Sequence, residues 1–191
     1  MDPTKIKRVA NWPPPQNLRD VRAFLGFTSF YRYFIPNYSM IACPLIDLTR
    51  KAVPFHWDIP QTKAFEELKT CMCQCPILCP MNYSLPFFLA TDALAYNMGA
   101  VHLQEGETNP CTQKPIQHPI AYYSAIFSPA ERNYDIYKQE LLVVIKVLEH
   151  WRLHVAATEI PVTILTDHAN LTFWKNPKKV NRRVAHWFAT L

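Results

Sequence analysis

The sequence predicts a mixed α/β fold, in which helices flank a mixed β-sheet and a small helical region comes first. From residue 81 onward, apolar runs and helical patterns follow in the order strand, strand, strand, helix, strand, helix, which is typical of a sheet covered by helices. Before residue 81, apolar residues recur at helical spacing. We therefore expect a helical segment over residues 1–50, a connector helix over 51–80 and a sheet domain over 81–191.

The composition fits a folded protein that binds a polyanion. Its 191 residues allow one or two domains, and 49% of them are hydrophobic, which is enough for a buried core. The formal net charge of +5 weakly favours a polyanionic partner. No apolar run approaches the roughly 20 residues that span a bilayer, and the Lys-rich start lacks the apolar stretch of a secretory signal. We expect an intracellular protein with no membrane partner.

The six cysteines do not follow a recognised zinc-site spacing. Four crowd one short stretch and two lie elsewhere: Cys71, Cys73, Cys75 and Cys79, with Cys43 and Cys111. The crowded stretch contains no C-x-x-C pair. We therefore expect free thiols in a reducing cytosol, with a metal site as the alternative.

Two helices are predicted before residue 81. Pro13–Pro15 stiffen the approach to the first, Asn17 is placed to cap its N-terminus, and Pro36 stops it. Asp58 is placed to cap the second, which covers residues 61–72. We assign the second helix no chemistry.

Strands and helices then alternate. The predicted strands cover residues 86–91, 99–104, 118–124 and 160–166. The polar stretch 105–117 reads as a hairpin loop. The long helix has two candidate starts, the capping-box pattern from Ser128 to Glu131 and a second start at Asp135. A last helix is expected from about Ala169.

Three carboxylates are predicted to lie near one another. Two apolar strands end in Thr-Asp, at Asp92 and at Asp167. A right-handed helical crossover makes such strands parallel, so that the two aspartates can emerge side by side. The crossover helix carries Glu140 at the edge of its apolar stripe. A carboxylate at that edge can lean over the end of the sheet.

These acids have two interpretations. Clustered carboxylates repel one another and persist when cations neutralise them, and oxygen-only ligands suit Mg²⁺ or Mn²⁺. Two such ions can clamp the attacking and leaving oxygens of a phosphodiester displacement. The alternative is that Asp92 and Asp167 are turn or cap residues and that Glu140 is solvated.

At these residues the sequence resembles gypsy-type long-terminal-repeat retrotransposons. Residues 81–191 resemble the family's ribonuclease H domain, and residues 12–48 resemble the thumb of its reverse transcriptase. The stretches that carry the first match are 88–93, 99–101, 118–124, 130–134, 140–142 and 165–168, and those that carry the second are 21–26, 31–35 and 44–48. Residues 55–57 and 76–78 fit the tether between the two.

The resemblance implies a function. The family hydrolyses the RNA strand of RNA/DNA hybrids with two Mg²⁺ or Mn²⁺ ions, and its first three catalytic and metal-binding acids fall on Asp92, Glu140 and Asp167. Its ribonuclease H domain works beside the polymerase palm and fingers of the same polyprotein. The nucleic-acid contacts that this implies are Arg19, Arg22 and Arg32 in the thumb and Lys178, Lys179, Arg182 and Arg183 near the end of the chain. Solvated surfaces remain the alternative for these basic residues.

The sequence also departs from the family. The fourth acid lies in a stretch beyond the position of Leu191, so we expect impaired cleavage by this chain. The family usually has Ser, Gly and an apolar residue where this chain has Leu94, Asn97 and His102. Asn tolerates a left-handed turn, and we expect His102 to be a satisfied surface or core histidine rather than a ligand. These changes leave a second function open, a non-catalytic interaction module that is domesticated or decayed.

Overall fold

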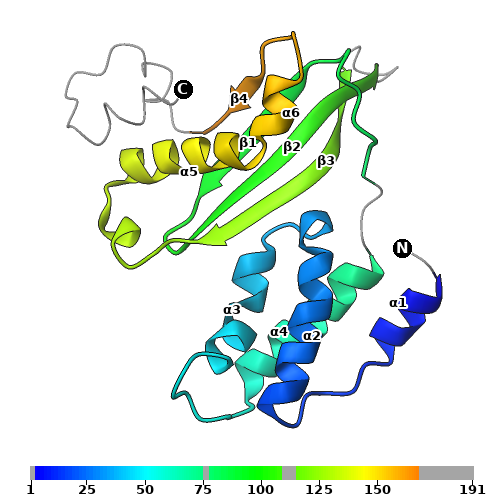
Figure 1. The fold of residues 1–191 in the computed structure, drawn as a ribbon, viewed down its shortest axis with the longest axis vertical. Coiled ribbons are helices and arrows are strands. Elements are labelled where there is room, and N and C mark those ends of the chain that lie inside the picture. The colour runs from blue at the N-terminus through cyan, green and yellow to red at the C-terminus, as the bar shows by residue number, and fades with distance from the viewer. Residues whose placement is uncertain (1–2, 75–77, 109–114, 168–191) are drawn as a thin grey trace. The chain divides into compact units, whose positions relative to one another are not determined.

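The structure, a computed structural model, describes residues 3–74, 78–108 and 115–167. It divides into two compact units, Met1–Ile77 and Leu78–Leu191, which are coloured from blue to cyan-green and from green to orange in Figure 1. Within the described ranges, no helix has both the length and the apolar character needed to cross a bilayer.

The first unit is a helical bundle with one hydrophobic core. It contains helices α1 (Pro3–Ala10), α2 (Leu18–Phe30), α3 (Tyr38–Leu48) and α4 (Ile59–Cys73), with a 3-10 turn η1 (Arg32–Phe34) after α2. Each α-helix contributes a fully buried side chain to that core, namely Val9, Phe24, Leu45 and Phe65. The connector helix, α4, therefore packs with the helices before it. The division near residue 50 stays a prediction.

The helix ends of this unit follow the predicted capping chemistry. The Asn17 side chain accepts a hydrogen bond of 3.0 Å from the backbone N–H of Asp20. Asp58 and Gln61 form a reciprocal capping box at the start of α4. Helix α2 ends at Phe30, six residues before Pro36, because the chain tightens into η1.

The second unit is built on a mixed four-stranded sheet. Its strands are β1 (Phe87–Ala93), β2 (Asn97–Thr108), β3 (Pro115–Ile126) and β4 (Thr163–Leu165). The order in the sheet is β3-β2-β1-β4, with β1 and β4 parallel and the other pairs antiparallel. The predicted mixed α/β fold is confirmed.

Strands β2 and β3 are longer than predicted. The pairing of β2 with β3 continues to Thr108 and Pro115, into the polar stretch expected to be a loop. Residues 106–108 are exposed, so polar side chains there remain hydrated while the backbone still pairs. The polar residues of this stretch therefore indicate that the strands are exposed there, and not that the strands end.

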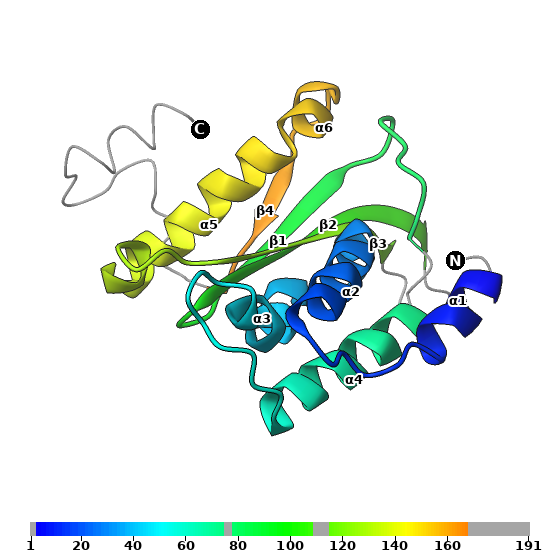
Figure 2. The same cartoon turned by 60° about the horizontal axis from the view of Figure 1, so that its bottom comes forward.

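Helices α5 (Ile136–His150) and α6 (Arg152–Ala156) belong to the same unit, and Figures 1 and 2 show α5 lying along the sheet. The core joins alternate residues of the strands, such as Leu89 and Met98, to Val143, Val147 and Trp151. The crossover from β3 to β4 therefore runs through α5, as the parallel pairing of β1 with β4 requires.

The long helix uses the second of its two candidate starts. The α-helix begins after Asp135, whose side chain accepts a hydrogen bond of 2.9 Å from the backbone N–H of Lys138. The Ser128–Glu131 capping box forms as well, but it caps the 3-10 turn η2 (Glu131–Asn133). The helix expected from Ala169 lies outside the described residues.

His102 is a core residue, as expected, but it is not satisfied. Its side chain is fully buried, and neither ring nitrogen has a hydrogen-bond partner in the part of the chain that the structure describes. The ring centroid lies 4.9 Å from that of Phe87, 5.1 Å from Trp151 and 5.8 Å from His154. Burial, with a smaller contribution from His154, lowers the pKa of His102 to about 4.

This burial predicts an acid-sensitive core. The pKa of His102 is lower in the folded protein than the usual 6.5, so its neutral form supports folding above pH 6.5 and the support is lost as pH falls toward 4. Between pH 7 and pH 5, the wild type should lose about 2 kcal/mol of unfolding free energy relative to His102→Leu. Urea unfolding at both pH values measures the difference. An equal pH dependence in the two proteins would contradict it.

Candidate active site

The two predicted aspartates follow paired positions on neighbouring strands. Ala90 of β1 is in register with Leu165 of β4. Asp92 and Asp167 each lie two residues beyond that pair, at the carboxyl ends of parallel strands whose backbones are about 4.8 Å apart. Both aspartates are exposed.

Helix α5 brings the third acid to the same end of the sheet. Glu140 retains only 4% of its accessible surface. The Glu140 carboxylate accepts a hydrogen bond from the backbone N–H of Ala93, the residue after Asp92. Its Oε2 atom is buried without a hydrogen-bond partner among the described residues. An orphan carboxylate oxygen at this depth calls for a proton or a cation.

The electrostatics of Glu140 connect the three acids. Burial, as the largest cause, acts together with the negative charges of Asp167 and Asp92 to raise the pKa of Glu140 to about 7. The hydrogen bond from Ala93 opposes them. The structure thus brings together the three residues that the sequence singled out, within range of mutual repulsion.

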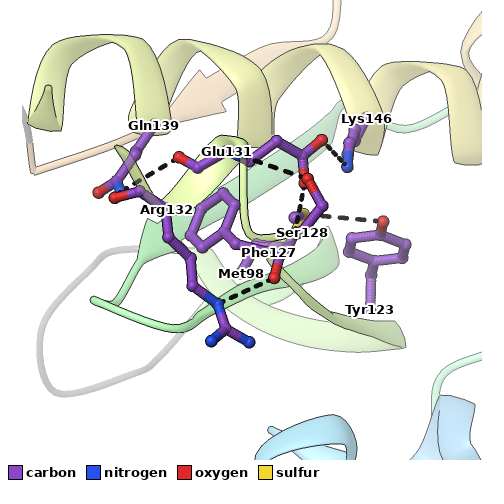
Figure 3. Close-up of polar contacts among 8 residues, drawn as sticks. All are labelled: Met98, Tyr123, Phe127, Ser128, Glu131, Arg132, Gln139 and Lys146. Atoms are coloured by element: carbon purple, nitrogen blue, oxygen red, sulfur yellow. Dashed lines mark hydrogen bonds and ion pairs between the residues drawn. The ribbon is translucent and has the colours of Figure 1, made fainter. Parts of the chain in front are cut away.

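A polar network fixes α5 to the turn that precedes it (Figure 3). Lys146 Nζ lies 2.7 Å from a carboxylate oxygen of Glu131. Gln139, the neighbour of Glu140, donates through Nε2 to the backbone carbonyl of Arg132 at 3.2 Å. Although burial raises the pKa of Glu131, hydrogen bonds from Lys146 and Ser128 outweigh it and hold that pKa below its usual range. The sequence signalled only the capping box.

The acids do not form a ready-made metal cage. Within residues 3–74, 78–108 and 115–167, no set of three or more His, Cys, Asp or Glu side chains is arranged so that it could hold a metal ion. The described cysteines, Cys43, Cys71, Cys73 and Cys79, are free thiols. Cys75 and Cys111 lie outside the described residues.

The predicted nucleic-acid contacts are only partly described. Arg19 and Arg22 are exposed on the first turns of α2. Arg32 is exposed in η1, where Nη2 donates to the Tyr33 hydroxyl at 2.8 Å. The four basic residues near the end of the chain lie outside the described residues: Lys178, Lys179, Arg182 and Arg183.

The two departures after Asp92 form a tight turn. Leu94 and Asn97 exchange backbone hydrogen bonds of 2.9 and 3.3 Å, and Leu94 is 41% exposed. Among the described residues with side chains, only Asn37 and Ala52 have a positive φ. Asn97 therefore does not use the left-handed conformation for which Asn would be suited.

Comparison with known proteins decides the family. The model of the RNase H-like domain found in reverse transcriptase matches residues 82–191. The chain belongs to this family.

Its relatives are retrotransposon polyproteins. The chain is 36% identical over 184 residues to the Tf2-3 and Tf2-4 transposon polyproteins of Schizosaccharomyces pombe, covering 95% of this chain and 13% of each relative. The RNase H-like family and these gypsy-type relatives agree with the resemblance seen in the sequence. The chain thus spans about an eighth of the length of these curated relatives.

Solved structures share the fold. The foamy viral protease-reverse transcriptase in complex with dsDNA matches with a TM-score of 0.79 at 22% identity, over 100% of this chain and 39% of that one. The same enzyme in complex with an RNA/DNA hybrid matches with a TM-score of 0.77 at 21% identity, over 99% of this chain and 25% of that one.

The repulsion at Glu140 predicts that this residue destabilises the metal-free protein. The pKa of Glu140 is higher in the folded protein than its usual 4.5, so the stability due to its protonated form is present below pH 4.5 and lost as pH rises through 7. At pH 8 without divalent metal, Glu140→Gln should raise the free energy of unfolding by about 1–3 kcal/mol.

The exposed Glu149 of the same helix offers a matched control, because Glu149→Gln removes a charge that is not buried. Chemical denaturation measures all three proteins. A Glu140→Gln protein less stable than the wild type at pH 8 would contradict the repulsion.

Proposed function

We propose that this RNase H-like domain hydrolyses the RNA strand of RNA/DNA hybrids, as part of a retrotransposon reverse transcriptase. The observation that carries the proposal is the buried Glu140 carboxylate, one oxygen of which has no hydrogen-bond partner among the described residues, and on which Asp92 and Asp167 act electrostatically. A structural ion pair does not explain this burial, because the charged groups that act on Glu140 in the described part of the chain are both acids. Three such acids at one end of a sheet favour a cation site.

Mg²⁺ or Mn²⁺ fits this donor set. Asp92, Glu140 and Asp167 would hold the ions, since hard divalent cations prefer carboxylate oxygens. When bound, two such ions activate water and stabilise the leaving oxygen of a phosphodiester. The protein's part is to hold Glu140 rigidly through α5 and to leave the two aspartates open to a substrate.

The proposed substrate is an RNA/DNA hybrid. Support comes from the foamy viral relative of the fold, which has been solved with such a hybrid and with dsDNA. In this chain, Arg19, Arg22 and Arg32 offer exposed guanidinium groups for backbone phosphates. The polymerase palm and fingers of the same polyprotein are the proposed protein partner.

A non-catalytic interaction module is the second candidate. Two observations favour it. The described acids are not arranged to hold a metal ion, and an exposed Leu94 stands beside them at a position where a polar residue would be expected from the family. The two functions differ in whether the acids matter for cleavage.

Cleavage separates the two candidates. A labelled RNA/DNA hybrid is incubated with Mn²⁺ and the RNA products are measured. We expect slow cleavage by this chain, because the acids in its described part are not arranged in advance for metal. Asp92→Asn and Asp167→Asn should each reduce the rate by about 10²–10³-fold, the usual cost of one well-placed electrostatic group. Rates unaffected by both substitutions, or no cleavage in a longer segment of the polyprotein either, would favour the interaction module.

Phosphate contacts by α2 predict a change in salt dependence. Lys and Arg contacts to phosphate release counterions, and each contact contributes about 0.9 to the slope of log affinity against log salt. The double variant Arg19→Ala and Arg22→Ala should lower that slope by about 1–2 in hybrid-binding titrations. Lys63→Ala, which removes an exposed charge from α4, is the control. An unchanged slope would make both arginines ordinary solvated residues.

A further inference from the structure

An exposed aromatic ring stands on the turn that follows Asp92. The turn joins β1 to β2, and its ends are held by the paired backbone bonds of Leu94 and Asn97. Tyr96 lies within this turn with 67% of its surface exposed. Small polar residues form such turns readily, so the turn itself does not require a large aromatic ring in solvent. This ring lies four residues after a site acid.

A guanidinium group covers that ring. The Cζ atom of Arg132, in η2, lies 5.4 Å from the ring centroid of Tyr96. Arg132 Nε also donates to the backbone carbonyl of Phe127 at 3.1 Å, as Figure 3 shows. The backbone N–H of Phe127 in turn donates to the carbonyl of Tyr96 at 3.0 Å. The backbone of Phe127 is thus hydrogen-bonded to both Tyr96 and Arg132, and these contacts hold the guanidinium in place before any ligand binds.

The charge of Arg132 is not neutralised within the described part of the chain. The adjacent Glu131 is engaged by Lys146, and Asp135 pairs with Lys138. Arg132 is exposed and forms no ion pair with a described residue. Arginine has five N–H donors, of which the bond to Phe127 uses one.

Arg132 also does not neutralise the carboxylates of the candidate site. The groups that shift the pKa of Glu140 are the burial of its own side chain, Asp167, Asp92 and the N–H of Ala93. A cation that balanced the acids would act on Glu140 in the opposite sense. The guanidinium forms no ion pair within the described ranges, so its charge can bind an external anion.

We propose that Arg132, seated on Tyr96, binds a backbone phosphate of the nucleic acid whose strand crosses the carboxylates. A strand rises about 3.3 Å per residue, so a turn three to four residues past Asp92 lies on the order of 10 Å from it. That is about three nucleotide steps of roughly 3.4 Å. Arg132 positions the strand and does not take part in the chemistry. The proposal rests on the proposed hybrid substrate.

The test is a binding titration with the whole chain. Wild type, Arg132→Ala, Arg132→Lys and Tyr96→Ala are titrated with a labelled RNA/DNA hybrid at several salt concentrations, without divalent metal so that cleavage does not intervene. Arg152→Ala is the matched control, because Arg152 is an exposed arginine of the same unit, on α6. Thermal unfolding of each protein shows whether it is folded.

Arg132→Ala should weaken binding about 5–20-fold and lower the salt slope by about 1, the loss of one phosphate contact. Arg132→Lys should keep the slope, because the charge remains. Tyr96→Ala should weaken binding less and also keep the slope, since only the seat of the guanidinium is lost. Arg152→Ala should match the wild type.

The outcomes distinguish a failure of the Arg132 phosphate contact from a failure of the proposed hybrid substrate. If the wild type binds the hybrid and Arg132→Ala binds with the same slope, the phosphate contact is wrong while the hybrid substrate stands. A lower melting temperature with an unchanged slope would likewise overturn it, in favour of a structural tie between the two turns. If the wild type does not bind the hybrid, both fall.

Discussion

The buried carboxylate of Glu140 is the constraint on which the second unit depends. Removing a carboxylate from water is costly, and one N–H from Ala93 does not offset it while Asp92 and Asp167 add repulsion. The surrounding structure maintains this arrangement. The parallel pairing of β1 with β4 brings the aspartates to one end of the sheet, and the bonds of Glu131, Gln139 and Lys146 hold α5 against it.

A second buried ionisable group, His102, lies near the other end of the same helix. Trp151, the residue that follows α5, packs on His102, whose pKa is lowered to about 4. The two groups respond to pH in opposite senses. As pH falls from 6.5 to 4.5, protonation of Glu140 supports folding while protonation of His102 opposes it. Because the two effects offset each other, the unfolding free energy of the wild type changes little over this range. Substitutions at Glu140 and His102 separate the two contributions.

The sequence predicted the fold well where local chemistry was decisive. Asn17, Asp58 and Asp135 cap helices as expected, and the Thr-Asp strand ends predicted neighbouring strands. It failed where tertiary contacts override local pattern. Glu105 and Thr108 pair because β3 runs beside them. His102 is buried, with no hydrogen-bond partner among the described residues, because the face of β2 that carries it is the core face. The contact between Arg132 and Tyr96 was not predicted, since residues 36 positions apart in the sequence come together only in the folded chain.

The central claim is that Asp92, Glu140 and Asp167 form one site for a divalent cation. Calorimetric titration of Mn²⁺ into the wild type, Asp92→Asn and the control Glu149→Gln tests it most directly. The account predicts weak binding by the wild type and by Glu149→Gln, because a set of acids that is not preformed must be drawn together by the ion. It predicts loss of that binding in Asp92→Asn. Equal Mn²⁺ binding by all three proteins would contradict it.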